Sequence, residues 1–167
     1  MQPIIEETTE EISADRQAIG AALMAFNEER APTKLGSYVV RLRAPGGEII
    51  GGLSAHHFYD WLHIEILIVP EEFRKQGIGT ELIRLAEQHA RAKGCTGVWL
   101  DTFEHQAPRF YQKLGYTEFG RLEGHPSSAR RYFSAKAFFR VNRVNHGHKI
   151  SDSLHSAWGR PVFLHGE

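Results

Sequence analysis

The most informative pattern of apolar and polar residues lies between positions 64 and 93. Ile64 to Val69 is an apolar run that only Glu65 interrupts. A glycine-containing segment, Phe73 to Thr80, follows. From Ile78 to Lys93 apolar residues then recur at helical spacing, with charged and amide side chains on the opposite face. This pattern predicts a strand, a turn and an amphipathic helix in succession.

Similar patterns predict the remaining elements. Before the central stretch we expect a short strand at Ile4–Thr8, a helix capped by Asp15 that extends to Arg30, strands at Ser37–Arg43 and Ile49–Ala55, a polar-aromatic bend at His56–Asp60, and a strand at Trp61–Val69. After it we expect a strand at Val98–Thr102, a helix at Gln106–Leu114, and strands at Tyr116–Leu122 and Arg130–Ala137. This order predicts a mixed α/β (α+β) fold with a partly antiparallel central sheet flanked by helices.

Composition places the chain among ordinary globular proteins. It has 167 residues, of which 41% are apolar and 24% charged, and its formal net charge is zero. Such a chain has no overall field that attracts nucleic acid or an anionic membrane. No apolar run approaches the roughly 18 residues of a membrane span, and the N-terminus lacks signal-peptide features. We therefore expect neither nucleic-acid nor membrane partners.

The single cysteine and the histidines indicate structural rather than metal-binding roles. One cysteine excludes an internal disulfide and fits a cytoplasmic location, and the position of Cys95 after Gly94 predicts a packed thiol. His146 and His148 lie in a segment without periodicity, so we expect a tail there rather than a metal site. We expect one domain over residues 1–140 and a C-terminal extension over residues 141–167.

The turn between the central strand and helix has the features of an anion site. Free backbone N–H groups and the positive end of the helix dipole meet at a helix N-terminus. Glycines such as Gly77 and Gly79 let a ligand approach the backbone closely. The segment therefore predicts either a phosphate-binding turn of unspecified ligand or a plain connection.

The same turn resembles a known signature. In FRKQGIG, Arg74, Gly77 and Gly79 match a motif of Gln or Arg, two residues, Gly, one residue, then Gly or Ala. This is the pyrophosphate-binding motif of the GNAT superfamily, the acyl-CoA-dependent N-acyltransferases. Lys75 stands where many relatives have glycine, which is compatible with the motif if only the backbone N–H of Lys75 is used.

A second match lies downstream, in QAPRFYQKLGYTEFG, and resembles the superfamily segment Ala-x-x-x-Tyr-x-Lys-x-Gly-Phe. The matching residues are Ala107, Tyr111, Lys113 and Gly115, and Tyr116 replaces the usual phenylalanine. Glu104 stands where relatives often have an asparagine that contacts pantetheine. The resemblance covers about residues 4–139.

The resemblance implies acetyl-CoA as acyl donor and no metal. It implies that the strand at Trp61–Val69 splays away from Val98–Thr102 and that the acyl carbonyl sits in the gap. The implied donor contacts are the main chain of Leu67, Ile68 and Val69 with pantetheine, and Arg74, Lys75, Gln76, Gly77, Ile78, Gly79 and Thr80 with the pyrophosphate.

Two residues are candidates for proton transfer. The resemblance assigns Tyr111 as the acid that protonates the departing thiolate. An alkyl amine is mostly protonated near pH 7, so a base is useful. Glu65, an acid in an apolar strand, is the best candidate: either it is buried there, which would raise its pKa, or it faces solvent in an alternating strand. His56 and His63 are weaker candidates.

The acceptor is expected to be a primary amine of a small molecule. An aromatic wall of Phe58, Tyr59 and Trp61, and acids such as Glu28, Glu29 or Glu104, would suit a cationic amine. Alternatives are a protein or peptide amine, or a non-catalytic acyl-CoA-binding module, against which the retained Tyr111 argues. A dinucleotide or P-loop site is disfavoured because its glycine spacing is absent. Strand edges that need cover favour a homodimer.

Overall fold

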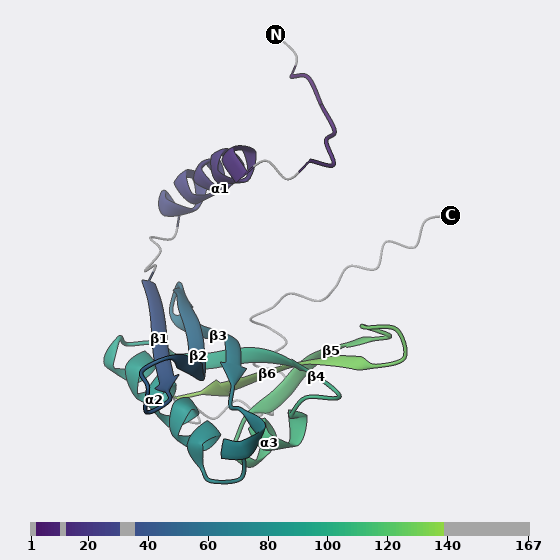
Figure 1. The fold of residues 1–167 in the computed structure, drawn as a ribbon. Helices are drawn as coiled ribbons and strands as arrows, with labels where there is room; N and C mark the ends of the chain where they lie inside the picture. The colour runs from purple at the N-terminus through teal and green to yellow at the C-terminus, as the bar shows by residue number, and fades with distance from the viewer. Residues whose placement is uncertain (1–2, 11–12, 31–35, 139–167) are drawn as a thin grey trace, which may run out of the picture. The chain divides into compact units, whose positions relative to one another are not determined.

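The computed structural model describes residues 3–10, 13–30 and 36–138 (Figure 1). The chain divides into two compact units, residues 1–34 and 35–167. The first unit contains helix α1, Ser13–Glu28, so the helix begins two residues before the predicted cap at Asp15. Residues 3–10 contain no strand, and the expectation of a strand at Ile4–Thr8 was wrong. The residues 141–167, with His146 and His148, lie outside the described part of the chain.

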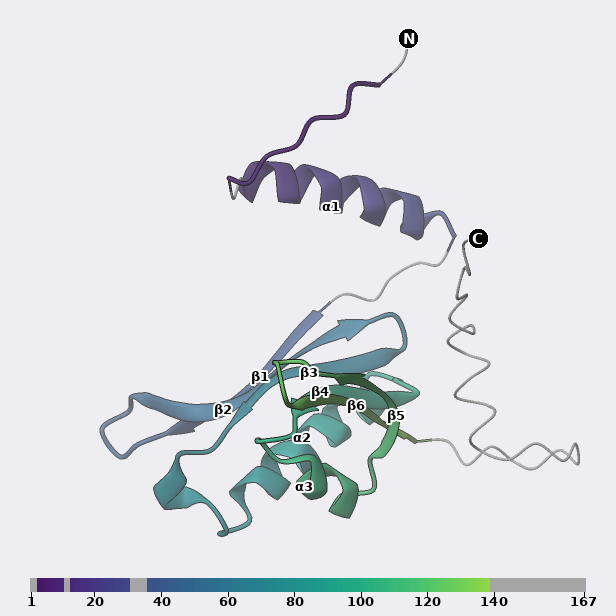
Figure 2. The ribbon, with the colours of Figure 1, turned by 90° about the vertical axis from the view of Figure 1, so that its right-hand side faces the viewer.

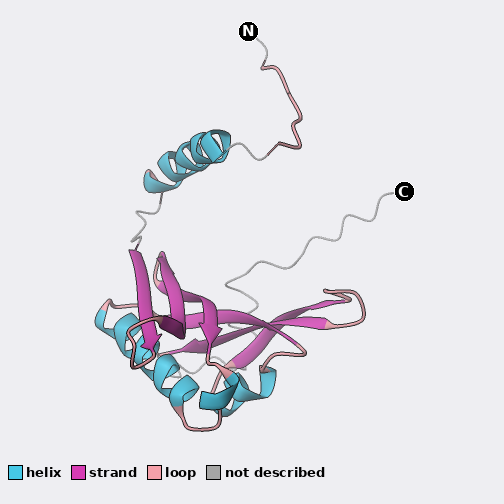
Figure 3. Cartoon of the chain, in the orientation of Figure 1, coloured by secondary structure: helices cyan, strands magenta, loops and turns pink. Residues whose placement is uncertain are grey.

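The second unit contains one six-stranded sheet and its helices (Figure 3). Its elements are β1 (Gly36–Arg43), β2 (Ile49–Phe58), β3 (Trp61–Ile68), a 3-10 turn η1 (Glu71–Phe73), α2 (Ile78–Ala92), β4 (Gly97–Phe103), α3 (Pro108–Lys113), β5 (Thr117–Glu123) and β6 (Arg130–Ala137). The strand order is β1-β2-β3-β4-β6-β5, and only the β3–β4 pair is parallel. The predicted mixed, partly antiparallel sheet is confirmed. Among the described residues no helix is long and apolar enough to cross a membrane.

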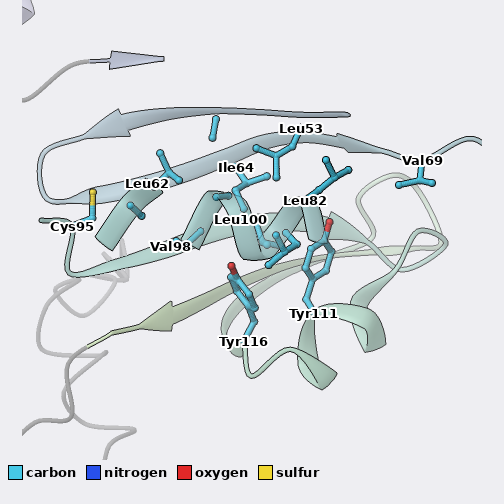
Figure 4. Packing of buried hydrophobic residues seen from close by; sticks show 14 residues of the cluster. Leu53, Leu62, Ile64, Val69, Leu82, Cys95, Val98, Leu100, Tyr111 and Tyr116 are labelled. Atoms are coloured by element: carbon cyan, nitrogen blue, oxygen red, sulfur yellow. The ribbon is translucent and has the colours of Figure 1, made fainter. Parts of the chain in front are cut away.

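The core lies between the sheet and α2. Figures 1 and 2 show α2 and α3 on the same face of the sheet. The helix buries the apolar stripe that its sequence predicted, including Leu82, Ala86 and Ala90, against Leu62 and Leu100 of the sheet (Figure 4). This burial of aliphatic side chains is the main stabilising contribution to such a layer. The stripe determines which face of α2 packs against the sheet, and α2 follows the end of β3 after a short turn.

Cys95 confirms the prediction of a packed thiol. It is buried at the start of the segment that leads into β4, and its Sγ lies 3.4 Å from Nδ1 of His57. His57 in turn lies 2.9 Å, between Nε2 atoms, from His89 of α2. The thiol therefore belongs to a buried polar cluster on the helix side of the sheet.

The β2–β3 connection differs from the prediction. A bend was expected at His56–Asp60, but β2 continues to Phe58 and only Tyr59 and Asp60 form the turn. Tyr59 has φ of 56°, a conformation that non-glycine residues adopt rarely. The longer strand pairs His56 directly with His63 of β3. This register brings the side chains of His56, His63 and Glu65 close together, which the sequence pattern did not indicate.

Candidate active site

The two parallel strands separate halfway along their length. β3 and β4 pair from Trp61 and Gly97 up to Ile64 and Leu100. β3 then continues to Ile68 and β4 to Phe103, with no further pairing between them in the part of the chain that the structure describes. The predicted splay is confirmed. It leaves the main-chain groups of β3 that face β4 available to an extended ligand, which can add to the strand as a peptide does.

A β-bulge marks the point of separation. Ser54 of β2 pairs with Ile66 and Ala55 pairs with Ile64, so Glu65 has no residue opposite it on β2. Bulges increase local twist and redirect a side chain. Glu65 is therefore both the first β3 residue beyond the last β3–β4 pair and the residue that the bulge displaces.

The turn after β3 provides a positively polarised backbone site. Gly77 immediately precedes α2 with φ of 85°, and Lys75 has φ of 60°. The first helical hydrogen bond runs from the N–H of Glu81 to the carbonyl of Gly77, at 3.0 Å. The N–H groups of the preceding residues Ile78, Gly79 and Thr80 have no carbonyl one turn earlier in the helix to bond. Together with the helix dipole they suit a pyrophosphate.

Two polar side chains brace this turn. Nε of Arg74 donates to the carbonyl of Val69 at 3.0 Å, and the amide of Gln76 donates to the carbonyl of Glu72 at 2.9 Å. These bonds fix the loop that joins β3 to α2. The structure thus gives Arg74 a local role, and its contact with an anion stays a prediction.

Gly79 allows α2 to begin close to α3. A Cβ placed on Gly79 would lie 3.3 Å from the Phe110 ring, tighter than an ordinary van der Waals contact. Phe110 precedes Tyr111 in α3, and the two rings meet edge to face at 5.0 Å. The two motifs that are separate in sequence therefore meet through Phe110.

Tyr111 is buried at this junction. It is 7% exposed, and Figure 4 shows its side chain extending from α3 into the core cluster near Leu100 and Leu82. Burial, with a smaller contribution from the Asp101 carboxylate, raises the pKa of Tyr111 to about 12. The phenol consequently keeps its proton at neutral pH. It can donate a hydrogen bond to a sulfur atom on which negative charge develops, although it is a weaker acid than a free phenol.

Glu65 is more exposed than predicted. Its side chain is 49% exposed, so Glu65 is not buried: it follows the buried Ile64 and points to the opposite face of the sheet by ordinary strand alternation. Its Oε2 lies 3.3 Å from Nδ1 of His56. The carboxylate therefore has an imidazole beside it that sequence reasoning did not connect to it.

His63 is enclosed beside this pair. Its ring stacks on Trp99 with centroids 3.6 Å apart and planes at 9°, and meets the His56 ring edge-on at 4.9 Å. Its Nε2 is buried without a hydrogen-bond partner in the described part of the chain. Burial, followed by the neighbouring His56, lowers the pKa of His63. His63 is thus held neutral and shielded.

Other residues expected near the acceptor lie elsewhere or are engaged. Phe58, Tyr59 and Trp61 lie in the β2–β3 turn or at the strand ends beside it, at the opposite end of β3 from the α2 turn. Glu104 forms an ion pair with Arg130 at 3.2 Å, so its charge is compensated. Glu28 and Glu29 belong to the first unit, which is described by itself.

The open strand pair, the helix N-terminus and the buried tyrosine are the features that the two sequence motifs predict for an acyl-CoA site. A sequence profile described as the acetyltransferase (GNAT) family matches residues 5–116. The chain belongs to this family.

Individual relatives support this family assignment. Over 107 residues the chain is 36% identical to an acetyltransferase of Agrobacterium fabrum, a match that covers 64% of this chain and 78% of that protein. It is 34% identical over 118 residues to blasticidin-S acetyltransferase of Streptomyces morookaense, covering 62% and 87%. A crystal structure assigned as an acetyltransferase from Agrobacterium tumefaciens superposes with a TM-score of 0.74 at 30% identity, covering 83% of this chain and all of that one.

The identity of the acyl donor is indicated by the family and by one solved complex. A Bacillus anthracis protein assigned as a streptothricin acetyltransferase, solved with acetyl coenzyme A, superposes with a TM-score of 0.52 at 25% identity, covering 66% of this chain and 65% of that one. The turn at Gly77 and the open edge of β3 fit the two parts of this donor, its pyrophosphate and its pantetheine arm. The chain is an acetyl-CoA-dependent acetyltransferase.

Proposed function

We propose that the protein transfers the acetyl group of acetyl-CoA to a primary amine of a small molecule by direct attack. The observation that carries this proposal is the splay after Ile64 and Leu100. Glu65 and Asp101 are the first residues beyond that last pair, and Tyr111 lies close enough to Asp101 for its pKa to respond. In this proposal Glu65 marks the proton-accepting side of the opening between β3 and β4, and Tyr111 marks the proton-donating side.

The donor is held by the main chain. The N–H groups of residues 76–80 hold the pyrophosphate, assisted by the N–H of Lys75 and the charge of Arg74. The main chain of Leu67, Ile68 and Val69 bonds to pantetheine. These contacts orient the thioester carbonyl in the opening, which converts a bimolecular reaction into one between positioned groups.

The reaction needs two proton transfers. The pair formed by Glu65 and the His56 imidazole beside it removes a proton from the amine as the amine nitrogen bonds to the acetyl carbon. Tyr111 donates its hydroxyl proton to sulfur as the carbon–sulfur bond breaks. Such positioned acid and base groups ordinarily contribute about 10²–10⁴-fold each.

The small-molecule acceptor is supported by the blasticidin-S acetyltransferase relative, whose named substrate is a small molecule. It is also supported by the exposure of Glu65, which leaves an anionic group open to a cationic amine. A cytoplasmic location and a homodimer stay predictions from the sequence.

The test is a turnover assay with a panel of small primary amines and peptides. Free thiol would be followed, and the acetylated product identified by mass spectrometry. We expect thiol release with at least one small amine, and thermal stabilisation by acetyl-CoA but not by NAD or ATP. Stabilisation without turnover on any amine would identify a binding module, and turnover only on peptides would identify a protein acceptor. Either outcome would overturn the proposal.

A further inference from the structure

The exposure of Glu65 makes this residue a poor general base for the proposed reaction. A carboxylate in contact with water ordinarily accepts a proton only at acidic pH, so alone it is a weak acceptor for an amine proton near pH 7. Burial was expected to remove this difficulty, and the structure shows that Glu65 is half exposed. A stronger base must therefore be sought among its neighbours.

His56 is the neighbour with suitable chemistry. It lies on β2 opposite His63, and its Nδ1 is 3.3 Å from Oε2 of Glu65. Its side chain is 37% exposed, so the imidazole is accessible to a molecule from solvent, and its partner Glu65 is the first β3 residue beyond the last β3–β4 pair. An imidazole is the side chain whose ordinary titration falls closest to neutral pH.

We propose that His56 is the catalytic base and that Glu65 is its positioning residue. Nδ1–H of His56 donates a hydrogen bond to the Glu65 carboxylate, which leaves the lone pair of Nε2 to take the amine proton. This inference rests on the proposed function, because it names the base of that same transfer.

With these groups, the source and destination of each transferred proton are defined. Nε2 of His56 takes one proton from the amine as the carbon–nitrogen bond forms, and the imidazolium stays beside the Glu65 carboxylate. Tyr111 gives its proton to sulfur as the carbon–sulfur bond breaks. After the products leave, the proton on His56 returns through water and Tyr111 is reprotonated. The net change moves one proton from amine to thiol.

His63 is unsuitable as the base but supports the one beside it. Its ring is stacked on Trp99 and its Nε2 is buried, so neither the stacked face nor that nitrogen is open to a substrate. Its edge-on contact restrains the His56 ring. Because His63 stays neutral, it adds no positive charge next to an imidazolium.

The charges around His56 are compatible with this role. On β3 it faces the Glu65 carboxylate and the neutral His63. On β1 it pairs with Ser37, which carries no charge. Asp101 and Arg131 both influence the pKa of His63. They form an ion pair at 2.6 Å, so their opposite charges largely offset each other. Glu65 therefore provides the uncompensated charge at the imidazole.

Kinetics of three variants of the full chain test the assignment. His56→Asn keeps a donor near the Nδ1 position and removes Nε2, so we expect kcat to fall about 100-fold. Glu65→Gln removes the carboxylate but leaves the imidazole, so we expect a smaller loss, about tenfold. His125→Asn, at an exposed histidine of the β5–β6 turn, is the matched control and should stay within about twofold of wild type.

The pH dependence of kcat/KM distinguishes protonation of the enzyme's base from protonation of the acceptor amine. For two acceptors of different amine acidity, wild-type kcat/KM should show an acid-side decline at a pH common to both, as an imidazole becomes protonated. That common decline should be absent in His56→Asn. If Glu65→Gln loses as much rate as His56→Asn, or if the common decline persists in His56→Asn, His56 is not the base.

The tautomer can be read without any acceptor. Ring ¹⁵N shifts of His56 at pH 8 should show the Nδ1–H form in wild type and a shift toward Nε2–H in Glu65→Gln. The same tautomer in both proteins would overturn the positioning role. Wild-type protein inactive on every amine would instead overturn the proposed function, and an active wild type with an equally active His56→Asn would overturn this inference alone.

Discussion

Ile64 and Leu100 form the last residue pair between β3 and β4, and both side chains are buried, at 3% and 1% exposure. The helix-facing side of the sheet is therefore closed at the position where strand pairing stops. Beyond it, the main-chain groups of β3 need another partner, because unpaired backbone polar groups are costly to leave unsatisfied. The pantetheine arm of acetyl-CoA is a partner of the right extended form.

Substitution of Gly77 tests the pyrophosphate turn. Gly77 has φ of 85°, and a Cβ added to it would meet no heavy atom within 4 Å, so alanine would introduce conformational strain without a clash. Left-handed backbone costs an L-residue about 1–2 kcal/mol. We expect Gly77→Ala to weaken acetyl-CoA binding about tenfold in isothermal titration calorimetry, because the strain is relieved by moving the N–H groups of the turn.

Gly124→Ala is the control for that experiment. Gly124 has φ of 67°, also with no heavy atom within 4 Å of an added Cβ, and lies in the β5–β6 turn. The substitution should lower stability similarly and leave acetyl-CoA affinity unchanged. Equal weakening of binding by both substitutions would argue against an anion site at Gly77.

Gly97 is required for close packing at the start of β4. A Cβ there would collide with the Trp61 ring and lie 2.7 Å from the carbonyl oxygen of Lys136. Overpacking of this kind costs about 1–3 kcal/mol. We expect Gly97→Ala to lower the free energy of unfolding in urea by that amount. Gly120→Ala, on β5 with open space around it, should change it by less than about 1 kcal/mol, and an equal loss would contradict the packing argument.

The buried histidines make stability depend on pH. Burial lowers the pKa of His57, with smaller effects of Lys93 and His56, and burial lowers the pKa of His89, with smaller effects of His57 and Lys93. Both are neutral in the folded protein, whereas the unfolded chain takes up protons below about pH 6.5. The stability that they contribute is complete above that pH and is lost as pH falls below it; the lowered pKa of His63 acts in the same direction.

Urea unfolding at pH 7.5, 6 and 5 would measure this dependence. Carboxylates also titrate toward pH 5, so the difference between wild type and His89→Gln is the informative quantity. Glutamine preserves a polar partner for His57 and does not titrate, so the variant should lose less stability on acidification. An equal or steeper loss in His89→Gln would contradict the account.

Features set by local sequence were predicted well. The apolar stripe of α2 and the glycine-containing turn before it depend on residues close together in the chain, and both appear where expected. The two motifs around Gly77 and Tyr111 indicated the family because each lies on such a local element. Their junction through Phe110 follows from packing that no spacing in the sequence indicates.

The acceptor side was predicted poorly for two physical reasons. The turn at Tyr59 and Asp60 lacks the Asn-Gly or Asp-Gly pair typical of two-residue hairpins, and a tyrosine at positive φ is not expected, so the register that places His56 opposite His63 was missed. Glu65 follows the buried Ile64 and lies on the opposite face of the strand, so ordinary alternation exposes its carboxyl, and the bulge shifts the alternation only from Ile66 onward. Phe58, a β-forming residue just beyond the two histidines, was the available signal for the longer strand.

The most direct test of the central claim is thiol release by Tyr111→Phe. The substitution removes one hydroxyl from a buried ring, so we expect turnover of acetyl-CoA with an active amine to fall at least about tenfold while acetyl-CoA affinity stays within about twofold. Tyr116→Phe, at the neighbouring buried tyrosine, also removes one hydroxyl from a buried ring and should keep wild-type turnover. Full activity in Tyr111→Phe, or an equal loss in Tyr116→Phe, would contradict the proposal that Tyr111 protonates the departing thiolate.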